Sequence, residues 1–210
     1  MPDREVGGPL EREELTELHY IAPVENVASI ARRGILSHTL ASQIDHTSIA
    51  MEEIQARRRM VVVPGGGPLH NYVNLYICAR NPMLYKRRAL HACLCVLRIN
   101  PKVLDLEGVV VSDRNASSQY ARFAPPPLGL QLISKEAVFS DFWTHPEDPI
   151  AEYRHKSIKC AEVLVPHRVP PELIMGGHVS CEATRDLLRP ALAQCGVSWH
   201  LTVNRHLFFL

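Results

Sequence analysis

The chain has 210 residues, of which 46% are hydrophobic and 21% are charged, and its formal net charge is +1. This composition is typical of one globular domain, here expected over residues 1–210, and it excludes the strongly basic proteins that grip duplex DNA through many phosphates. No apolar run reaches the roughly 18 residues that cross a bilayer, and the charged first segment lacks the apolar centre of a signal peptide, so we expect a cytoplasmic protein that does not engage a membrane.

Apolar periodicity and turn residues predict the elements of the first half of the chain. Pro23 suits the first turn of a helix that Gly34 ends, and the segment 71–79 alternates as a strand does. In chain order we expect a loose or weakly helical lead-in over 1–16, a strand over 17–22, a helix over 23–33, an amphipathic helix over 48–59, a loop over 64–68, a strand over 71–79 and a short helix over 83–89.

The second half of the chain predicts further strands with few helices between them. The run 91–99 is apolar on both faces, as in a central strand. After it we expect an apolar stretch over 102–111 that bends at Gly108, a loop over 125–127, a short helix or turn over 136–143, a strand over 160–165, a helix over 182–194 that Pro190 can kink, and a last strand over 197–203. Strands and helices do not alternate regularly, so we predict the α+β class.

Several kinds of catalytic or metal site lack support in the sequence. The six cysteines include no CxxC pair, and several lie in apolar runs, so we expect reduced, buried thiols and no zinc. The histidines form no HxxxH or HxH pattern that indicates a metal site, and no GxSxG sequence marks a nucleophilic serine. The loop Gly65–Gly67 is not followed by the Lys-Ser/Thr of a phosphate-binding P-loop.

Glu162 stands out because it lies inside a predicted strand. Alternation places it on one face with Cys160 and Leu164, and a carboxylate among apolar neighbours is costly unless it is paired or used. A charge on an edge strand that blocks aggregation would explain the same pattern.

The run Arg57-Arg58-Arg59 is a basic cluster at the end of a predicted helix. It can hold a pyrophosphate or a nucleic-acid backbone, or it can be a solvated helix end that complements the helix dipole. His19 and Tyr20 end the first strand just before a helix N-terminus, where anions and polar ligands bind, although this pair alone favours a structural role.

Several sequence blocks, in order along nearly the whole chain, together resemble a known family. They are YIAPVENV at 20–27, IQARR at 54–58, VPGG at 63–66, LHNYVNLY at 69–76, RNPMLY at 80–85, DRNA at 113–116 and AEVLVP at 161–166. These blocks look like the DarT family, toxins of the DarT–DarG toxin–antitoxin systems, within the ADP-ribosyltransferase superfamily. The resemblance implies transfer of ADP-ribose from NAD⁺ to a base of single-stranded DNA, with thymine or guanine left open. It also implies a macrodomain antitoxin of the DarG type as partner.

The resemblance also implies a fold and site residues. The fold would be a split, mixed β-sheet core with peripheral helices and with NAD⁺ held in the cleft. Glu162 would be the catalytic glutamate and Arg58 the essential arginine, with Arg57 as the alternative. The family often shows His-Ile-Thr at the opening strand, where this chain has Tyr20-Ile21-Ala22. The residues expected to bind NAD⁺ are His19 or Tyr20, Ile21, Ala22, Asn26 and Arg58.

The acceptor base would meet the strand over 71–79. The family's frequent His-Asp-Tyr-Val is His70-Asn71-Tyr72-Val73 here. We therefore predict His70, Tyr72 and Tyr76 as substrate-binding residues, with the tyrosines offering stacking surface. Tyr72 and Tyr76 can instead be ordinary cross-strand aromatic residues.

Cleavage of the nicotinamide–ribose bond builds positive charge on the ribose, which a rigidly held carboxylate such as Glu162 can stabilise. A guanidinium stays protonated in proteins, so Arg58 is expected to orient and stabilise rather than accept a proton. The alternatives are a transferase that acts on protein or RNA, an NAD⁺ glycohydrolase with water as acceptor, and a non-catalytic nucleotide-binding or interaction module.

Overall fold

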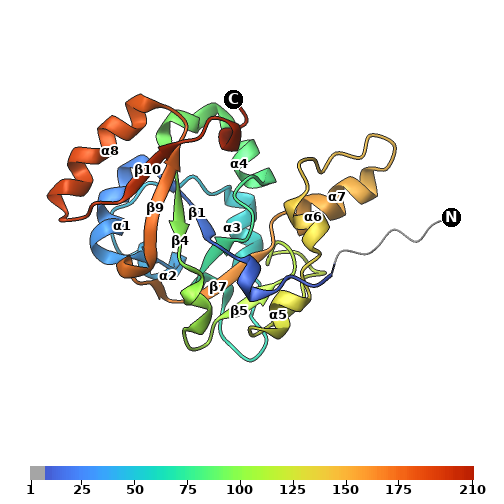
Figure 1. Cartoon of the computed structure of the whole chain (residues 1–210). Helices are drawn as coiled ribbons and strands as arrows, with labels where there is room; N and C mark the ends of the chain where they lie inside the picture. Colours follow the sequence, from blue (N-terminus) through green and yellow to red (C-terminus); the bar gives the residue numbers. More distant parts are fainter. Residues whose placement is uncertain (1–7) are drawn as a thin grey trace.

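The computed structural model describes residues 8–210, in which an eight-stranded sheet forms the centre of the molecule (Figure 1). The strand order is β10-β9-β4-β1-β3-β7-β5-β6, and a two-stranded sheet pairs β2 with β8. The strands are β1 (Leu18–Pro23), β2 (Ile35–Leu36), β3 (Tyr72–Tyr76), β4 (Leu94–Ile99), β5 (Val110–Ser112), β6 (Phe123–Ala124), β7 (Glu162–Pro166), β8 (Arg168–Val169), β9 (Ile174–Val179) and β10 (His200–Val203). The pair β9–β10 is parallel and the other pairs are antiparallel, so the predicted mixed sheet of an α+β fold is confirmed.

The sheet is split between β1 and β3. Strand β1 pairs with β4 along its whole length, from Leu18 opposite Ile99 to Pro23 opposite Leu94. Its pairing with β3 is limited to His19 opposite Tyr76, so the two strands diverge beyond that point. Backbone groups that leave a ladder face the space between the strands and are free to meet a ligand or solvent. This wedge is the split that the family resemblance predicts.

Helices surround the sheet without alternating with its strands. They are α1 (Val27–Arg33), α2 (His38–Ala41), α3 (Glu52–Arg59), α4 (Pro82–Lys86), α5 (Leu128–Gln131), α6 (Lys135–Phe139), α7 (Pro149–Ile158) and α8 (Glu182–Gln194). Short 3-10 segments are η1 (Arg12–Glu14), η2 (Val24–Asn26), η3 (Leu69–Asn71), η4 (Arg88–Cys93), η5 (Pro101–Asp105), η6 (Pro171–Leu173) and η7 (His206–Phe208). Helices α1 and α8 contact each other at one end of the sheet, while α5, α6 and α7 gather at the end where β5 and β6 lie (Figure 1).

The main core lies on one face of the sheet, where α1 and α8 cover it. On β7 it takes the side chains of Val163 and Val165, which alternate with Glu162 and Leu164 on the opposite face. Smaller apolar clusters on that opposite face contain Tyr76 and Leu164, among others. The alternation predicted for this strand is therefore confirmed, and it sets Glu162 on the face away from the main core.

Two helices, α4 and α7, begin where capping residues place them. Pro82 stands in the first turn of α4, and the Asn81 side chain accepts a hydrogen bond from the Leu84 N–H. In α7, Pro149 has the same place, and Asp148 accepts from two N–H groups of the first turn. Helix α7 is absent from the sequence-based expectations because none of its side chains is fully buried, so it shows no apolar stripe.

Several element boundaries differ from the predictions. The lead-in predicted for 1–16 lies partly outside the described residues, and its described part contains η1. Strand β4 begins at Leu94 because residues 91–93 belong to η4. The stretch 102–111 divides into η5, which Pro101 and the Asn100 side chain start, and β5. Helix α3 begins at 52 rather than 48, α6 spans 135–139 rather than 136–143, β3 ends at 76 rather than 79, and β10 begins at 200 rather than 197. Strand β9 was not predicted, since Gly176 and Gly177 interrupt its apolar pattern.

Among the helices of residues 8–210, none combines the length and the apolar character needed to cross a membrane.

Candidate active site

A cleft opens in the wedge between β1 and β3. Its walls come from β1, η2, α2, the loop after α2, α3, η3 and β3. The residues that line it include Tyr20, Ile21, Pro23, Asn26, His38, His46, Thr47, Gln55, Arg58, His70, Tyr72, Asn74, Tyr76 and Asn115. Most of the residues that the sequence singled out thus come together here from segments far apart in the chain.

Glu162 and Arg58 form a buried ion pair at this site. Arg58 Nη1 lies 3.1 Å from Glu162 Oε2 and 3.3 Å from Oε1, and the two residues are 7% and 0% exposed. The Ala116 N–H also donates to Glu162 Oε1, at 3.4 Å. Burial raises the pKa of Glu162, and Arg58 and the Ala116 N–H act against that rise. A buried charge is tolerated only when it is paired and hydrogen-bonded in this way.

The position of β7 decides between the two interpretations of Glu162. Strand β7 lies between β3 and β5, with Tyr76 and Ser112 directly opposite Glu162 on either side. The edge-strand interpretation is therefore wrong. A carboxylate in an interior strand that needs a partner 104 residues away is placed there at a cost in solvation, which is typical of a functional group.

Helix α3 brings Arg58, and not Arg57, to the glutamate. Arg57 pairs with Glu53 one helical turn away, and its side chain is 53% exposed. Arg59 is exposed as well. Because successive helical residues point about 100° apart, the last turn of α3 can aim one arginine inward while its neighbours face solvent.

Only some of the residues on β1 that were predicted to bind NAD⁺ line the cleft. Tyr20 and Ile21 line the cleft. The Ala22 side chain is fully buried in the main core. His19 lies outside the lining and hydrogen-bonds Glu17, with Nε2 and Oε1 3.0 Å apart.

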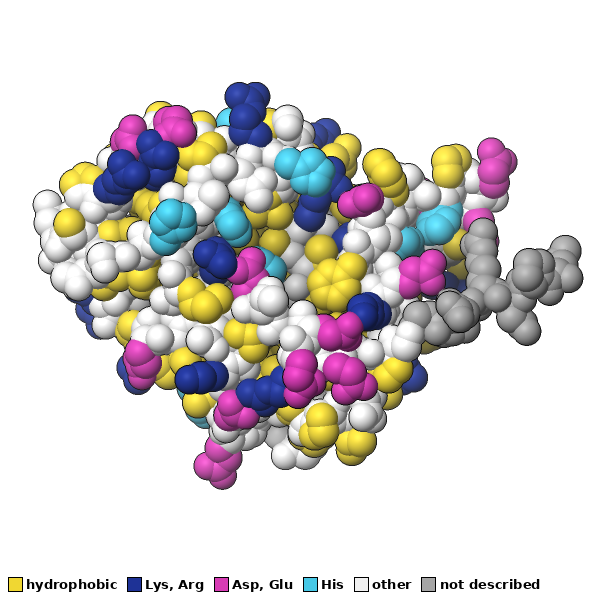
Figure 2. Space-filling model, viewed as in Figure 1, with side chains coloured by type: hydrophobic (Ala, Val, Ile, Leu, Met, Phe, Trp, Pro, Cys, Tyr) yellow, Lys and Arg dark blue, Asp and Glu magenta, His cyan; other side chains and the backbone are white. Residues whose placement is uncertain are grey.

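His19 belongs to a polar cluster over β1, β4 and β9. Glu17 Oε2 accepts a hydrogen bond from Arg98 Nε at 2.5 Å, and Glu17 Oε1 lies 3.7 Å from His178 Nε2. Figure 2 shows histidine, basic and acidic side chains gathered where these strands run. Close contacts with His178, His19 and Arg98 hold the pKa of Glu17 well below its usual range. The Glu17 carboxylate therefore stays charged and hydrogen-bonds His19, which explains why the His19 side chain points to this cluster.

Asn26 lines the cleft, but its side chain is hydrogen-bonded to the backbone of the cleft wall. Its Nδ2 donates to the Thr47 carbonyl at 2.7 Å, and its Oδ1 accepts from the Thr47 N–H at 3.0 Å. Thr47 Oγ1 also hydrogen-bonds Glu25 Oε2. The paired amide contacts hold the loop after α2 against the cleft, so Asn26 shapes the site through that loop.

The predicted substrate-binding residues lie on β3 and just before it. Tyr72 and Tyr76 are each 8% exposed and line the cleft, and Tyr76 is directly opposite Glu162. The rings of His70 and His38 are in contact, with centroids 4.2 Å apart and planes tilted by 44°. Burial, followed by nearby positive groups, lowers the pKa of both histidines, so both are neutral near pH 7. His70 Nε2 and Gln55 Oε1 are buried in the cleft wall without a hydrogen-bond partner, which suits a polar ligand.

Two residues at the site were not assigned a role from the sequence. Asn115 lines the cleft and Ala116 supplies the N–H that reaches Glu162. Both lie in the block 113–116 that contributed to the family resemblance. A backbone N–H carries no signal in a sequence, so this contact is visible only in the fold.

The cysteines and the other histidines form no second chemical centre in the described part of the chain. No cluster of His, Cys, Asp and Glu in residues 8–210 could hold a metal ion. The six cysteines are free thiols, of which Cys95 and Cys160 are buried and Cys93 is exposed. The expectation of buried thiols is thus confirmed for Cys95 and Cys160 and wrong for Cys93, which lies in η4 rather than in the strand predicted there. The other three thiols are half-buried.

A family model described as ssDNA thymidine ADP-ribosyltransferase, DarT, matches residues 19–209. Among curated proteins, the DNA ADP-ribosyl transferase of Thermus sp. (strain 2.9) is 32% identical over 175 residues, which cover 77% of this chain and 79% of that protein. That of Thermus aquaticus is 31% identical over 173 residues, covering 76% of this chain and 72% of that protein. A DNA ADP-ribosyl transferase–DNA ADP-ribosyl glycohydrolase fusion protein of Thermosipho africanus is 27% identical over 187 residues; the match covers 84% of this chain and 45% of the fusion.

Solved structures show the same similarity in three dimensions. Thermus sp. 2.9 DarT in complex with ADP-ribosylated ssDNA superposes with a TM-score of 0.82 at 25% identity, covering 95% of this chain and 99% of that one. The same protein in complex with carba-NAD⁺ gives a TM-score of 0.77 at 24% identity, covering 92% of this chain and 98% of that one. Both structures therefore share the fold of this chain.

Proposed function

The chain belongs to the DarT family of ssDNA thymidine ADP-ribosyltransferases, and from this premise we propose that it transfers ADP-ribose from NAD⁺ to a thymidine base of single-stranded DNA with Glu162 and Arg58 as its catalytic pair. The observation that carries the assignment of the pair is the buried contact between Arg58 Nη1 and Glu162 Oε2 at the cleft between β1 and β3. Membership in a family of thymidine ADP-ribosyltransferases favours thymine over guanine, a choice that the sequence left open.

NAD⁺ supplies the ADP-ribosyl group: the bond between the ribose and nicotinamide breaks, a bond from the ribose to a nitrogen of the base forms, and the proton of that nitrogen is lost to solvent. The carboxylate of Glu162 stabilises the positive charge that develops on the ribose, and it accepts a hydrogen bond from a ribose hydroxyl. Because Glu162 stands on an interior strand and is already hydrogen-bonded, little rearrangement accompanies this charge development. Arg58 favours the ionised form of Glu162 against the effect of burial, which raises the pKa of Glu162, and we assign Arg58 an orienting role.

The remaining residues build the walls of the site. We propose that Tyr20 and Ile21 contact NAD⁺, whereas His19 and the Ala22 side chain do not, because His19 is held by Glu17 and the Ala22 side chain is in the core. The orphaned polar atoms of Gln55 and His70 fit a polar ligand in the cleft.

The acceptor side is assigned to β3. We place the acceptor base beside Tyr72 and Tyr76, on the face that carries Glu162. Aromatic rings give bases a stacking surface in single-strand recognition.

A radiolabel transfer assay tests the function directly. Label on the adenylate portion of NAD⁺ is followed into short oligonucleotides that contain one base type each, with Glu162→Ala alongside. Transfer to thymidine-containing strands that Glu162→Ala abolishes is the expected result. Transfer to RNA or protein instead would assign another acceptor, and free ADP-ribose released without DNA would indicate a glycohydrolase.

We further propose that residues 1–210 form one transferase domain that acts as the toxin of a toxin–antitoxin pair, with a DarG-type macrodomain glycohydrolase as partner. The fusion protein of Thermosipho africanus, in which the transferase and the glycohydrolase share one chain, supports this pairing. Induction in a bacterial host should arrest growth, and co-expression of such a glycohydrolase should restore it. Growth arrest that persists with Glu162→Ala would contradict the toxin assignment.

A further inference from the structure

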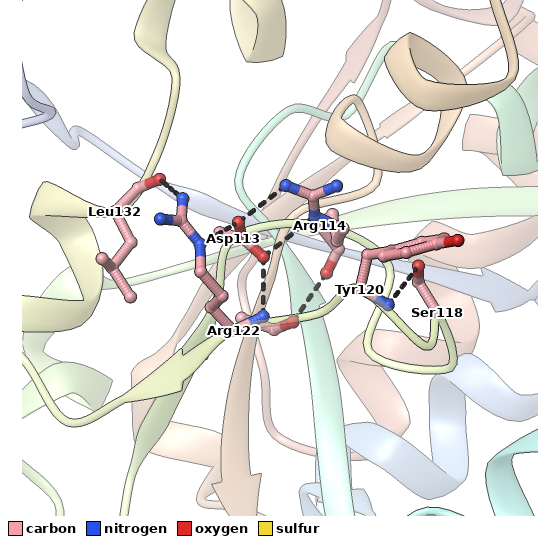
Figure 3. A network of polar contacts seen from close by, with 7 residues as sticks. Asp113, Arg114, Ser118, Tyr120, Arg122 and Leu132 are labelled. Atoms are coloured by element: carbon pink, nitrogen blue, oxygen red, sulfur yellow. Dashed lines mark hydrogen bonds and ion pairs between the residues drawn. The ribbon is translucent and has the colours of Figure 1, made fainter. Parts of the chain in front are cut away.

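A closed loop connects β5 to β6 beside Glu162. The loop begins at Asp113, which is 2% exposed and accepts four hydrogen bonds from two arginines (Figure 3). Arg114 donates from Nε to Oδ1 at 3.1 Å and from Nη2 to Oδ2 at 3.0 Å. Arg122 donates from its backbone N to Oδ1 and from Nε to Oδ2, both at 2.9 Å. The Asp113 N–H in turn donates to the Arg122 carbonyl at 3.1 Å, which closes the loop 113–122.

Each of the three residues after Asp113 makes a backbone hydrogen bond, and the last of these bonds reaches Glu162. The Arg114 carbonyl accepts from Ser112 Oγ at 2.8 Å. The Asn115 N–H donates to the Ser157 carbonyl in α7 at 2.8 Å. Ala116, which is fully buried, then directs its N–H to Glu162 Oε1 at 3.4 Å. The loop therefore leads from a buried carboxylate clamp to the carboxylate of the proposed catalytic pair.

We propose that Asp113 is a positioning residue of the transferase centre, which closes the loop 113–122 and thereby holds the Ala116 N–H against the Glu162 carboxylate. This inference rests on the proposed catalytic role of Glu162 and gives a function to the block 113–116, which the sequence analysis left without one.

The geometry makes the Ala116 contact sensitive to the loop. At 3.4 Å the N–H and the carboxylate oxygen are near the long end of hydrogen-bonding distances, so a small displacement of Ala116 removes the bond. Asp113 is also well anchored: burial raises its pKa, but the hydrogen bonds from Arg114 and Arg122 outweigh burial and leave the pKa below its usual range. The clamp is thus charged, and stiff, throughout the pH range in which an enzyme works.

Loss of the Ala116 contact has a consequence that a loop without a catalytic role would not have. The ionisable groups that face Glu162 are Arg58 from α3, Tyr76 from β3 and Cys160, which lies just before β7. Burial raises the pKa of both Tyr76 and Cys160, the latter to about 12, so both are neutral. Arg58 and the Ala116 N–H are the groups that favour the charged form of Glu162, and losing one of them moves the pKa of Glu162 further upward.

The clamp can be weakened without leaving a deeply buried charge. In Asp113→Asn one side-chain oxygen still accepts from the Arg122 N–H, while the charge that attracts both guanidinium groups is gone. The Arg114 and Arg122 side chains are 20% and 59% exposed, so their charges remain partly solvated. Arg122→Gln is milder, because it removes one guanidinium at an exposed position.

The test compares pH profiles of label transfer to a thymidine oligonucleotide for the wild-type protein, Asp113→Asn and Arg122→Gln. Asp105→Asn is the matched control, since Asp105 pairs with Arg12 at the surface, where its side chain is 60% exposed. For Asp113→Asn we expect kcat to fall about tenfold at neutral pH, KM for NAD⁺ to stay within about twofold, and the acidic limb of the profile to move up by about half a pH unit or more. Arg122→Gln should shift the limb in the same direction by less, and Asp105→Asn should leave it in place.

An acidic limb that stays at the wild-type position in both clamp variants would overturn the inference, even if kcat falls, because the loop would then act on stability alone. If Asp113→Asn does not fold, Arg122→Gln decides by the same criterion. Glu162→Ala in the same assay keeps this result separate from the proposed function. If the wild-type protein transfers label and Glu162→Ala does not, the function stands whatever the clamp variants show.

Discussion

Arg58 Nη1 lies 3.1 Å from Glu162 Oε2 in a buried contact between the last turn of α3 and an interior strand of the sheet. Each charge depends on the other, because neither residue is exposed enough to be solvated by water. The contact links the stability of the site to its chemistry, and changes at either residue should affect both.

Glu162→Gln should reduce label transfer by about a hundredfold or more, because the amide cannot stabilise positive charge on the ribose. It should also lower the free energy of unfolding by about 3 kcal/mol, since Arg58 is left as an unpaired buried charge. Transfer kinetics and urea unfolding measure the two effects. Glu107→Gln, the same change at an exposed position, serves as control. Near-normal transfer by a folded Glu162→Gln protein would remove Glu162 from the catalytic pair.

Arg58→Lys and Arg57→Lys separate the two candidate arginines. Lysine keeps the positive charge but loses the planar fork and reaches its partner as a single point charge. Arg58→Lys should therefore lower kcat about tenfold or more, with a smaller loss of stability than removal of the charge. Arg57→Lys should change kcat less than about twofold, because Arg57 is exposed and pairs with Glu53 on its own helix. The reverse pattern would assign the essential role to Arg57.

Glu17→Gln is expected to change the pH dependence of stability. The pKa of Glu17 in the folded protein lies below its unfolded value, so its ionised form contributes stability above the unfolded pKa, and that stability is lost as pH falls. At pH 7 the variant should be about 1–2 kcal/mol less stable than the wild-type protein. The difference should shrink below about pH 4, where the unfolded carboxyl also binds a proton. Urea unfolding at pH 7 and pH 3 tests this, and an equal difference at both values would contradict the assignment.

Asn26→Ala should act on NAD⁺ binding more than on chemistry. The change removes both hydrogen bonds to the Thr47 backbone and frees the loop that forms one wall of the cleft. We expect KM for NAD⁺ to rise about threefold to tenfold while kcat changes little. The reason is that a less ordered loop weakens NAD⁺ binding by about 1–2 kcal/mol in free energy. Asn100→Ala, which removes a side-chain cap far along the chain from this loop, should leave KM unchanged. A fall in kcat without a change in KM would place Asn26 closer to the reacting atoms.

Local patterns predicted most of the strands but not how they meet. The alternation around Glu162 in the strand 160–165 placed it correctly on the face opposite Val163 and Val165. Neither the edge nor the interior position of that strand can be read from alternation, because pairing partners lie far apart in the sequence. Strand β9 was missed because Gly176 and Gly177 carry no side chains to show a pattern. Helix α7 was missed because its side chains are not fully buried.

The site was predictable where side chains form the family blocks and unpredictable where backbone groups act. Arg58, Tyr72 and Tyr76 line the cleft, and Glu162 lies buried behind it in contact with Arg58; their roles stay predictions from the resemblance. The choice of Arg58 over Arg57 depends on how α3 is rotated, which a basic run of three arginines does not specify. The Ala116 N–H and the Asp113 clamp depend on loop geometry.

His19 and Tyr20 offer the sharpest remaining distinction at the opening strand. The two side chains have different surroundings in the structure. Tyr20 lines the cleft, whereas His19 Nε2 is 3.0 Å from Glu17 Oε1 in the cluster over β1, β4 and β9. Tyr20→Leu should therefore raise KM for NAD⁺ about fivefold or more, through loss of aromatic contact in the cleft. His19→Gln should lower the melting temperature by a few degrees, through the lost contact with Glu17, and leave KM within about twofold. Calorimetric NAD⁺ titration of both variants measures the difference, and a larger loss of affinity in His19→Gln would show that His19 turns into the cleft when NAD⁺ binds.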